Sequence, residues 1–411
     1  MQKLLPSRLR TSVARSAILG VFAAVACGDN LAVNEPVVVE NPAPVGSAQP
    51  SLAPGANGRV WLSWLERGAD SVLALKVVAR EGGRWGTVRD VVHSGDLLAN
   101  WADIPRVAEM QGGRIVAGWL RGSSVKEGYD LLIATSSDSG ATWSAGQPAH
   151  HDGLAAEHGF VSFFPQGDAL GMIWLDGRNY ALADTARREM QLMYATLDAA
   201  GTLTREFAID DRICDCCQTA AVTTANNVTV VAYRDRSREN IRDIAVKRLL
   251  GTVISAAVPV HADNWHINGC PVNGPSIAAQ GATVALAWFT APNDTPHVRL
   301  AFSQDTGRTF GPPVEVHDGR PEGRVALGLT PAGDALVSWV EVKGDTSQLQ
   351  LRRVSAAGRK GPARTLASLS GGKRASGFAR IVVSGSEAMI TWADPATRRV
   401  QTAVIPVGAA K

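Results

Sequence analysis

The cysteines are the residues of this chain with the clearest capacity for chemistry. Beyond Cys27, four lie in two short segments, RICDCCQT and INGCPVNGP: Cys214, Cys216, Cys217 and Cys270. Clustered thiolates bind soft metal ions such as Cu(I) or Zn(II), and His266 or His158 would be further ligands. In an exported protein the same thiols would pair as disulfides, although a bond between adjacent cysteines would be strained. Both interpretations stay open.

Arginines are the second group with a plausible chemical role. Several alternate with aspartate, as in the segment YRDRSRENIRD (233–243). A planar guanidinium can bind a carboxylate through two parallel hydrogen bonds. We therefore expect an anion-binding clamp drawn from Arg106, Arg178, Arg234, Arg236 and Arg242. The alternative is a solvated loop whose charges pair with one another.

Three aspartates accompany these arginines and are the candidate acid–base groups: Asp103, Asp176 and Asp235. Hydrolysis of a glycoside needs two carboxyl groups that face each other at a separation of about 5 to 10 Å. Asp103 paired with either of the other two aspartates would meet this need only if the fold brings them to one cleft.

The elements that must position these residues recur along the chain. Short apolar runs end in an aromatic residue at intervals of 51 to 59 residues: Trp64, Trp119, Trp174, Tyr233, Trp288, Trp339 and Trp392. A repeat of this size made of short strands indicates a propeller, whose units bury their faces against each other. We expect an all-β propeller of four-stranded blades over residues 35–408. Seven blades are expected, and six are the alternative if one weak repeat is an insertion.

The last repeat is one strand short, and EPVVVE (35–40) offers the missing strand that would close the ring. In such a ring, the loops from fourth to first strands and from second to third strands open on one face. We call this the funnel face. The cysteines, the arginine loops and all eight histidines fall in or beside these loops. Ring closure is therefore expected to bring them to a shared mouth.

The first residues have the pattern of a targeting segment. Four basic residues precede a ten-residue apolar stretch that is too short to span a bilayer, and Cys27 follows it. We expect a signal peptide over 1–26, a lipid on Cys27, a linker over 27–34, and an exported monomer held at the membrane by its lipid alone. The alternative is an ordinary secretory signal. Without the four signal residues the formal charge falls from +3 to −1, which gives no electrostatic case for nucleic acid.

Two turns share the pattern S-x-D-x-G-x-T-[WF], at 136–143 and 303–310. This pattern is the Asp-box, and with the repeat and the export signal it makes the chain resemble the sialidase superfamily of BNR-repeat propellers. The resemblance implies an arginine triad for the carboxylate of sialic acid, a tyrosine nucleophile activated by glutamate, and an aspartate as acid–base. This sequence departs from that pattern, because Ile104-Pro105-Arg106 replaces the order Arg-Ile-Pro and no tyrosine follows Tyr233.

Three functions follow from these observations. The first is a sialidase-like lipoprotein that binds a glycan or another small anion in the central funnel. The second is an active exo-sialidase or related glycoside hydrolase. The third is a metal or redox site built on the cysteines, with Cu or Zn as the cofactor.

Overall fold

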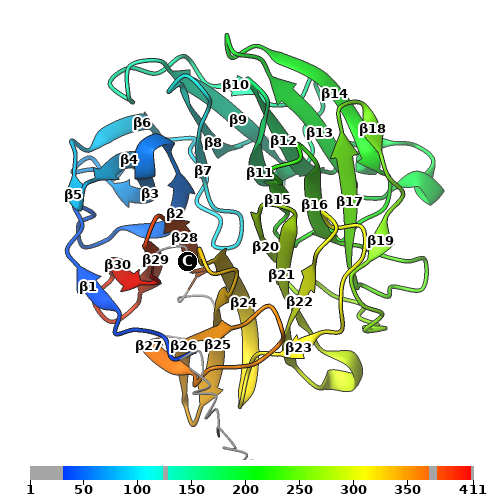
Figure 1. The fold of residues 1–411 in the computed structure, drawn as a ribbon. Helices are drawn as coiled ribbons and strands as arrows, with labels where there is room; N and C mark the ends of the chain where they lie inside the picture. Colours follow the sequence, from blue (N-terminus) through cyan, green and yellow to red (C-terminus); the bar gives the residue numbers. More distant parts are fainter. Residues whose placement is uncertain (1–30, 124–127, 370–376, 409–411) are drawn as a thin grey trace, which may run out of the picture. The chain divides into compact units, whose positions relative to one another are not determined.

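Seven antiparallel sheets form a ring in the part of the chain that the structure describes (Figure 1). The structure is a computed structural model and describes residues 31–123, 128–369 and 377–408. Each sheet corresponds to one sequence repeat, so the seven-bladed propeller is confirmed and the six-bladed alternative is wrong. The expected signal segment 1–26 and the lipidation candidate Cys27 lie outside the described residues.

The first strands of the blades surround the axis of the ring (Figure 1). In the order of blades 1 to 7 they are β2 (Ala48–Pro54), β7 (Arg106–Glu109), β11 (His158–Gln166), β15 (Ala220–Thr223), β20 (Ser276–Gln280), β24 (Arg320–Leu329) and β28 (Arg380–Ser384). The strand register shifts near the start of three of them, at Gln49, Phe160 and Arg324. Each of these residues has a positive φ. A bulge of this kind redirects the side chain next to it, here at the funnel face.

The second strands carry the repeating aromatic residues. They are β3 (Val60–Arg67), β8 (Ile115–Gly122), β12 (Ala169–Asp176), β16 (Thr229–Arg234), β21 (Thr283–Thr290), β25 (Ala335–Lys343) and β29 (Glu387–Asp394). Both faces of each blade pack on a neighbour, so these strands read as continuous apolar runs. Trp64, Trp174, Trp288 and Trp339 are fully buried. In blade 4, Tyr233 replaces tryptophan, and its hydroxyl donates to Asp210 at 2.7 Å.

The third strands complete most of each sheet, and the fourth strands are shorter and lie at the outside. The third strands are β4 (Leu73–Glu81), β9 (Tyr129–Ser136), β13 (Gln191–Leu197), β17 (Ile244–Leu250), β22 (His297–Ser303), β26 (Thr346–Val354) and β30 (Arg399–Pro406). The fourth strands of blades 1 to 6 are β6 (Arg89–Ser94), β10 (Gln147–Pro148), β14 (Leu203–Asp210), β19 (Val258–Pro259), β23 (Val314–Glu315) and β27 (Arg364–Leu369). Two short hairpin strands extend the third strands, β5 (Arg84–Trp85) and β18 (Val253–Ile254).

Strand β1 (Val37–Val39) supplies the outer strand of blade 7 by pairing antiparallel with β30. Figure 1 shows this N-terminal strand beside the C-terminal one. Asn41 strengthens the junction by donating to the carbonyl of Val400 at 3.0 Å and to the hydroxyl of Thr402 at 3.2 Å. The predicted closure of the ring by an N-terminal strand is confirmed. Val33, at the end of the expected linker, is buried between blades 6 and 7.

The two S-x-D-x-G-x-T turns join third to fourth strands, on the face opposite the funnel face. The carboxylate of Asp138 accepts from the backbone N–H and the hydroxyl of Thr142, at 2.9 and 2.6 Å. Asp305 makes the same pair of contacts with Thr309, at 2.9 and 2.7 Å. Hydrogen bonds from Thr142 lower the pKa of Asp138 to about 2. These aspartates are occupied in turns and are remote from the funnel loops.

Within the described residues, the helical structure consists of four single turns: η1 (Ala56–Gly58), η2 (Arg178–Ala181), η3 (Thr185–Arg187) and η4 (Pro292–Asp294). None of the helices in the described ranges has the length and apolar character needed to cross a bilayer.

Candidate functional site on the funnel face

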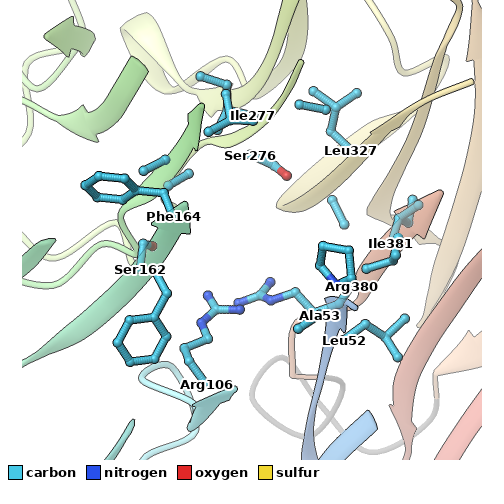
Figure 2. A pocket seen from close by; sticks show the side chains of 18 of the residues that line it. Leu52, Ala53, Arg106, Ser162, Phe164, Ser276, Ile277, Leu327, Arg380 and Ile381 are labelled. Carbon is cyan, nitrogen blue, oxygen red and sulfur yellow. The ribbon is translucent and has the colours of Figure 1, made fainter. Parts of the chain in front are cut away.

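A channel runs along the axis of the ring and holds a cavity of about 470 Å³. Its wall is formed by the seven first strands and is mainly apolar or small, with Ala53, Phe164 and Leu327 among the lining residues. Two guanidinium groups interrupt this wall. Figure 2 shows Arg106, at the start of β7, and Arg380, at the start of β28, pointing toward each other inside the channel.

Apart from the charge of Asp103 near Arg106, these two arginines have few partners among the described residues. Arg106 donates to the hydroxyl of Ser51 at 3.4 Å, and Arg380 donates to the carbonyl of Ala379 at 3.1 Å. The Nε and Nη2 atoms of Arg380 are buried without a hydrogen-bond partner. Burial lowers the pKa of Arg106 to about 10. Burial, together with the charge of Arg106, also lowers the pKa of Arg380. Two like charges in a narrow channel favour an anion between them.

Asp103 lies behind Arg106 and is almost fully buried. Its Oδ2 accepts the backbone N–H of Phe160 at 2.7 Å. Burial raises the pKa of Asp103 to about 7, although the hydrogen bond from Phe160 and the charge of Arg106 act in the opposite direction. Among the predicted acid–base candidates, this carboxyl is the one placed next to an arginine that lines the channel, and it titrates near neutrality.

Aromatic rings and a third arginine lie beside the mouth of the channel. Arg324 lies over Trp101 and Phe378, with its Cζ atom 5.6 and 6.0 Å from the two ring centroids. The rings of Trp101 and Phe378 are stacked with centroids 6.0 Å apart. Arg380 lies 5.8 Å from the centroid of Phe378. The mouth therefore combines cationic groups with flat apolar surface, a pairing suited to a small ligand that is anionic on one side and apolar on another.

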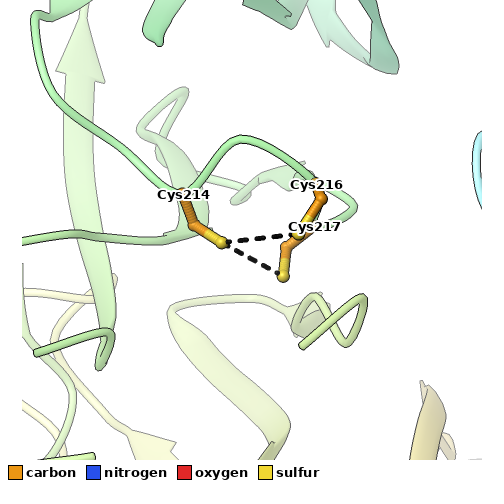
Figure 3. A group of neighbouring side chains, drawn as sticks. All are labelled: Cys214, Cys216 and Cys217. Atoms are coloured by element: carbon orange, nitrogen blue, oxygen red, sulfur yellow. Dashed lines mark hydrogen bonds between the residues drawn. The ribbon is translucent and has the colours of Figure 1, made fainter. Parts of the chain in front are cut away.

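The four predicted cysteines come together at the junction of blades 3, 4 and 5. The sulfur of Cys214 lies 3.9 Å from that of Cys216 and 3.5 Å from that of Cys217 (Figure 3). Cys270 lies near Cys216, with its sulfur 4.0 Å from a carboxylate oxygen of Asp215. A disulfide needs sulfurs about 2.05 Å apart, and all four cysteines are free thiols in the structure. No pair of these sulfurs is at disulfide distance, so the structure does not show the disulfides expected from export.

The arginines of the segment YRDRSRENIRD contact different groups and do not converge on one ligand site. Arg234 is buried and donates to the backbone carbonyls of Asn273, Arg242 and Phe289, so it joins the loops of blades 4 and 5. The Nη1 atom of Arg242 lies 3.1 Å from the sulfur of Cys214 and 3.1 Å from Asp215 Oδ1.

Arg236 and Asp235 of this segment have partners other than the cysteines. Arg236 pairs with Glu189 at 2.8 Å. Asp235 accepts the backbone N–H of Arg236 at 2.8 Å, and burial raises the pKa of its carboxyl.

Asp176, Arg178 and His158 form a further cluster between blades 2 and 3. Asp176 is fully buried and accepts the indole N–H of Trp174 and the guanidinium of Arg178. His158 stacks on His150 with ring centroids 3.6 Å apart. Asp152 contacts both imidazoles, at 2.7 Å for His150 and 3.0 Å for His158.

The carboxylates of this cluster favour the protonated form of His158. Burial alone would lower the pKa of His158, but the carboxylates of Asp152 and Asp176 outweigh it and raise the pKa. Asp152, His158 and Asp176 offer ligand atoms within 4.8 Å of one another, as do Asp130, His150 and His158. In the structure these groups pair with each other and with Arg178 as an ion-pair network.

The structure therefore does not bring the predicted site residues together as one anion clamp, and Arg234, Arg236 and Asp235 have the separate partners given above. The remaining residues lie in three places. Asp103 and Arg106 belong to the channel, Asp176, Arg178 and His158 to the ion-pair network, and the cysteines and Arg242 to the sulfur cluster. His266 is exposed, and its backbone pairs with Ile241 rather than approaching the sulfurs. Arg380 was missed by the sequence analysis. Its signal was present, because ARIVVS in blade 7 aligns with PRVAEM in blade 2 and places both arginines at the start of a first strand.

Comparison with known proteins shows the fold of the chain. No protein-family model matches the sequence, and no curated protein does. A solved structure described as "Hadza microbial sialidase Hz136" aligns with 82% of this chain and 73% of its own length, at 16% identity and a TM-score of 0.54. A Dyadobacter fermentans protein of unknown function aligns with 92% of this chain and 100% of its own, at 13% identity and a TM-score of 0.50. Such low identities show a shared propeller fold and carry nothing about chemistry.

Proposed function

We propose that this protein binds a small carboxylate ligand, such as an acidic sugar or the acidic end of a glycan, in the mouth of its central channel. The observation that carries the proposal is the pair Arg106 and Arg380, whose guanidinium groups converge while Nε and Nη2 of Arg380 have no partner. A buried charge without a partner is unfavourable, and a carboxylate between the two groups would compensate both. The cavity of about 470 Å³ falls within the usual range of ligand pockets, roughly 300 to 1,000 Å³.

The preference for an acidic sugar rests on analogy of fold, since a sialidase is among the structural neighbours. Trp101, which is half-buried and stacks on the buried Phe378, adds flat apolar surface on which a sugar ring can pack. We further propose that the BNR-type turns, the export signal and a lipid on Cys27 belong to the same assignment. The protein would then present its funnel face to ligands outside the cytoplasm, as a monomer without a nucleic-acid partner.

Calorimetric titration with N-acetylneuraminic acid and with glucuronic acid tests the proposal. We expect one site per chain, with affinity lowered about 10- to 100-fold in Arg106→Met and in Arg380→Met, because each variant removes charge-assisted hydrogen bonds of about 1.5 to 3 kcal/mol. The methyl ester of each sugar should not bind. Arg353→Met is the matched control, because Arg353 pairs with Asp334 at 2.7 Å near the opposite face. Unchanged affinity in both channel variants, or no binding of any carboxylate sugar, would overturn the proposal.

Hydrolysis of an acidic glycoside is a second candidate, favoured by the pKa of Asp103 near 7, although its expected carboxyl partners Asp176 and Asp235 lie in other clusters. A carboxyl that titrates near the working pH can give and take a proton. Release of a fluorescent alcohol from an aryl sialoside tests this candidate. Activity that is lost in Asp103→Asn while binding of N-acetylneuraminic acid is kept would support catalysis. Binding without release from any aryl glycoside of an acidic sugar would leave the protein as a binding module.

A further inference from the structure

The loop that carries three of the cysteines is held from several sides. The backbone N–H of Ile213 donates to the carbonyl of Met190, and that of Cys214 donates to the carbonyl of Arg234, both at 3.0 Å. Beyond the cysteines, the side chain of Gln218 donates to Ala102 O at 2.7 Å. The same side chain accepts the backbone N–H of Gly274 at 3.0 Å. These contacts tie the loop to blades 2, 3, 4 and 5, so the sulfur positions are set by the fold rather than by a flexible surface segment.

Within this loop the three sulfurs form a compact triangle (Figure 3). The distances from Cys214 are 3.9 and 3.5 Å, and all three sulfurs lie within 4.8 Å of one another. A metal ion bound at about 2.3 Å to three thiolates would space them about 4 Å apart. The triangle therefore needs little adjustment to hold one ion. Cys214 and Cys217 are buried, while Cys216 is half-buried and gives access to the site.

A positively charged side chain next to the triangle favours the thiolate form of its cysteines. Arg242 Nη1 lies 3.1 Å from the sulfur of Cys214, where its positive charge stabilises a thiolate. Asp215 is engaged by the same guanidinium at 3.1 Å. Among the described residues, the sulfur of Cys270 lies within 4.8 Å of ligand atoms of Cys216 and Asp215. It does not form such a group with all three sulfurs of the triangle. The sulfurs that could all bind one metal ion are therefore three, those of Cys214, Cys216 and Cys217.

We propose that Cys214, Cys216 and Cys217 form a three-thiolate site for Cu(I). Soft thiolate ligands select Cu(I) and Zn(II), but structural zinc sites are almost always tetrahedral with four ligands. Here the fourth candidate, Cys270, is exposed and lies outside the triangle. The site is independent of the proposed anion site in the channel, and either one can exist without the other.

Anaerobic titration of the full chain with Cu(I), in competition with bicinchoninate, tests this site. We expect one Cu(I) per chain, with thiolate-to-copper absorption in the near ultraviolet. Cys216→Ser should weaken binding at least about 100-fold, because losing a ligand exceeds the usual effect of losing a residue that only orients one. Cys270→Ser is the matched control and should leave Cu(I) affinity within a few fold. Circular dichroism of both metal-free variants would establish that they fold.

Three results would overturn the assignment. The first is the absence of Cu(I) binding by folded wild-type protein. The second is Zn(II) bound more tightly than Cu(I) in a form that requires Cys270, which would indicate a tetrahedral zinc site. The third is a pattern of alkylation, measured by peptide mass spectrometry. In this pattern the four cluster cysteines do not react with an alkylating reagent until the protein has been reduced. That pattern would place disulfides in the protein.

Discussion

At the scale of single residues, Asp103 in blade 2 and Asn273 in blade 5 occupy equivalent positions of the sequence repeat. Each lies three residues before the start of a first strand and accepts the backbone N–H of a bulge residue in the next blade, Phe160 for Asp103 and Arg324 for Asn273. Both donors have a positive φ. In both blades a glycine precedes the donor, because a Cβ there would collide with the accepting side chain. The acceptor position therefore needs an oxygen but not a charge, so the carboxyl of Asp103 is free to serve another role.

Asp103→Asn should remove a pH-dependent part of the stability. The folded pKa of Asp103, about 7, lies above its ordinary value of 3.8. Folding therefore takes up a proton between these values, and this contribution is present at low pH and lost as the pH rises toward 7. A shift of this size corresponds to about 4 kcal/mol. Urea unfolding at pH 4, 5, 6, 7 and 8 should show wild type losing stability relative to the variant.

The comparison has an internal control, because asparagine already accepts the equivalent hydrogen bond in blade 5. If the difference between wild type and Asp103→Asn stays constant from pH 4 to pH 8, then Asp103 is ionised in the folded protein and the general-acid role falls with it.

At the scale of single elements, the two S-x-D-x-G-x-T turns contact the preceding blade, blade 1 for the turn of blade 2 and blade 4 for the turn of blade 5. Gly307, in the turn of blade 5, has a φ of +76° and faces Val230 in blade 4. Gly140, in the turn of blade 2, has a φ of +82° and faces Arg89 in blade 1. The two turns share their hydrogen bonds but differ in the space around the glycine, which allows backbone strain to be separated from packing.

Gly307→Ala should destabilise the fold more than Gly140→Ala. Both substitutions force alanine into a left-handed conformation, at a cost of about 1 to 2 kcal/mol. At Gly307 a Cβ would also lie 2.8 Å from Val230 Cγ2, whereas the nearest atoms at Gly140 are 3.7 Å away. Overpacking adds roughly 1 to 3 kcal/mol. Urea unfolding of the two variants measures the difference, and equal losses would mean that Val230 rotates without penalty.

The elements were more predictable from the sequence than the contacts between them. The aromatic-ended runs gave each second strand, because strands buried on both faces read as continuous apolar segments such as VALAW before the turn at 291. The spacing of the sequence repeat was enough to predict that Cys270 lies near Cys216. The same spacing could not predict that the sulfurs are unbonded in the structure, nor that Asp176 accepts hydrogen bonds from Trp174 and Arg178. Those outcomes depend on side-chain directions and loop contacts between blades, which leave no regular pattern in the sequence.

At the scale of the whole molecule, ring closure depends on one short strand. The backbone of β1 pairs with the edge of β30. In the segment that follows β1, Asn41 and Ala43 are buried. Without β1 the edge of β30 would present unpaired N–H and carbonyl groups, which is the usual template for association between chains. The stability of a seven-bladed ring is therefore coupled to a segment at the other end of the chain.

A chain that begins at residue 44 should lose this closure and associate. We expect its Tm to fall by about 5 °C or more, since several kcal/mol of strand pairing and burial are lost, and we expect dimers or larger species by light scattering. A synthetic peptide of residues 33–43 should restore both the Tm and the monomer. The same peptide with Asn41→Ala should restore less, because Asn41 donates to Val400 and Thr402 from a buried position. A scrambled peptide should have no effect. A truncated chain that stays monomeric with an unchanged Tm would mean that the first and last blades hold together without β1, and that the strand serves the edge alone.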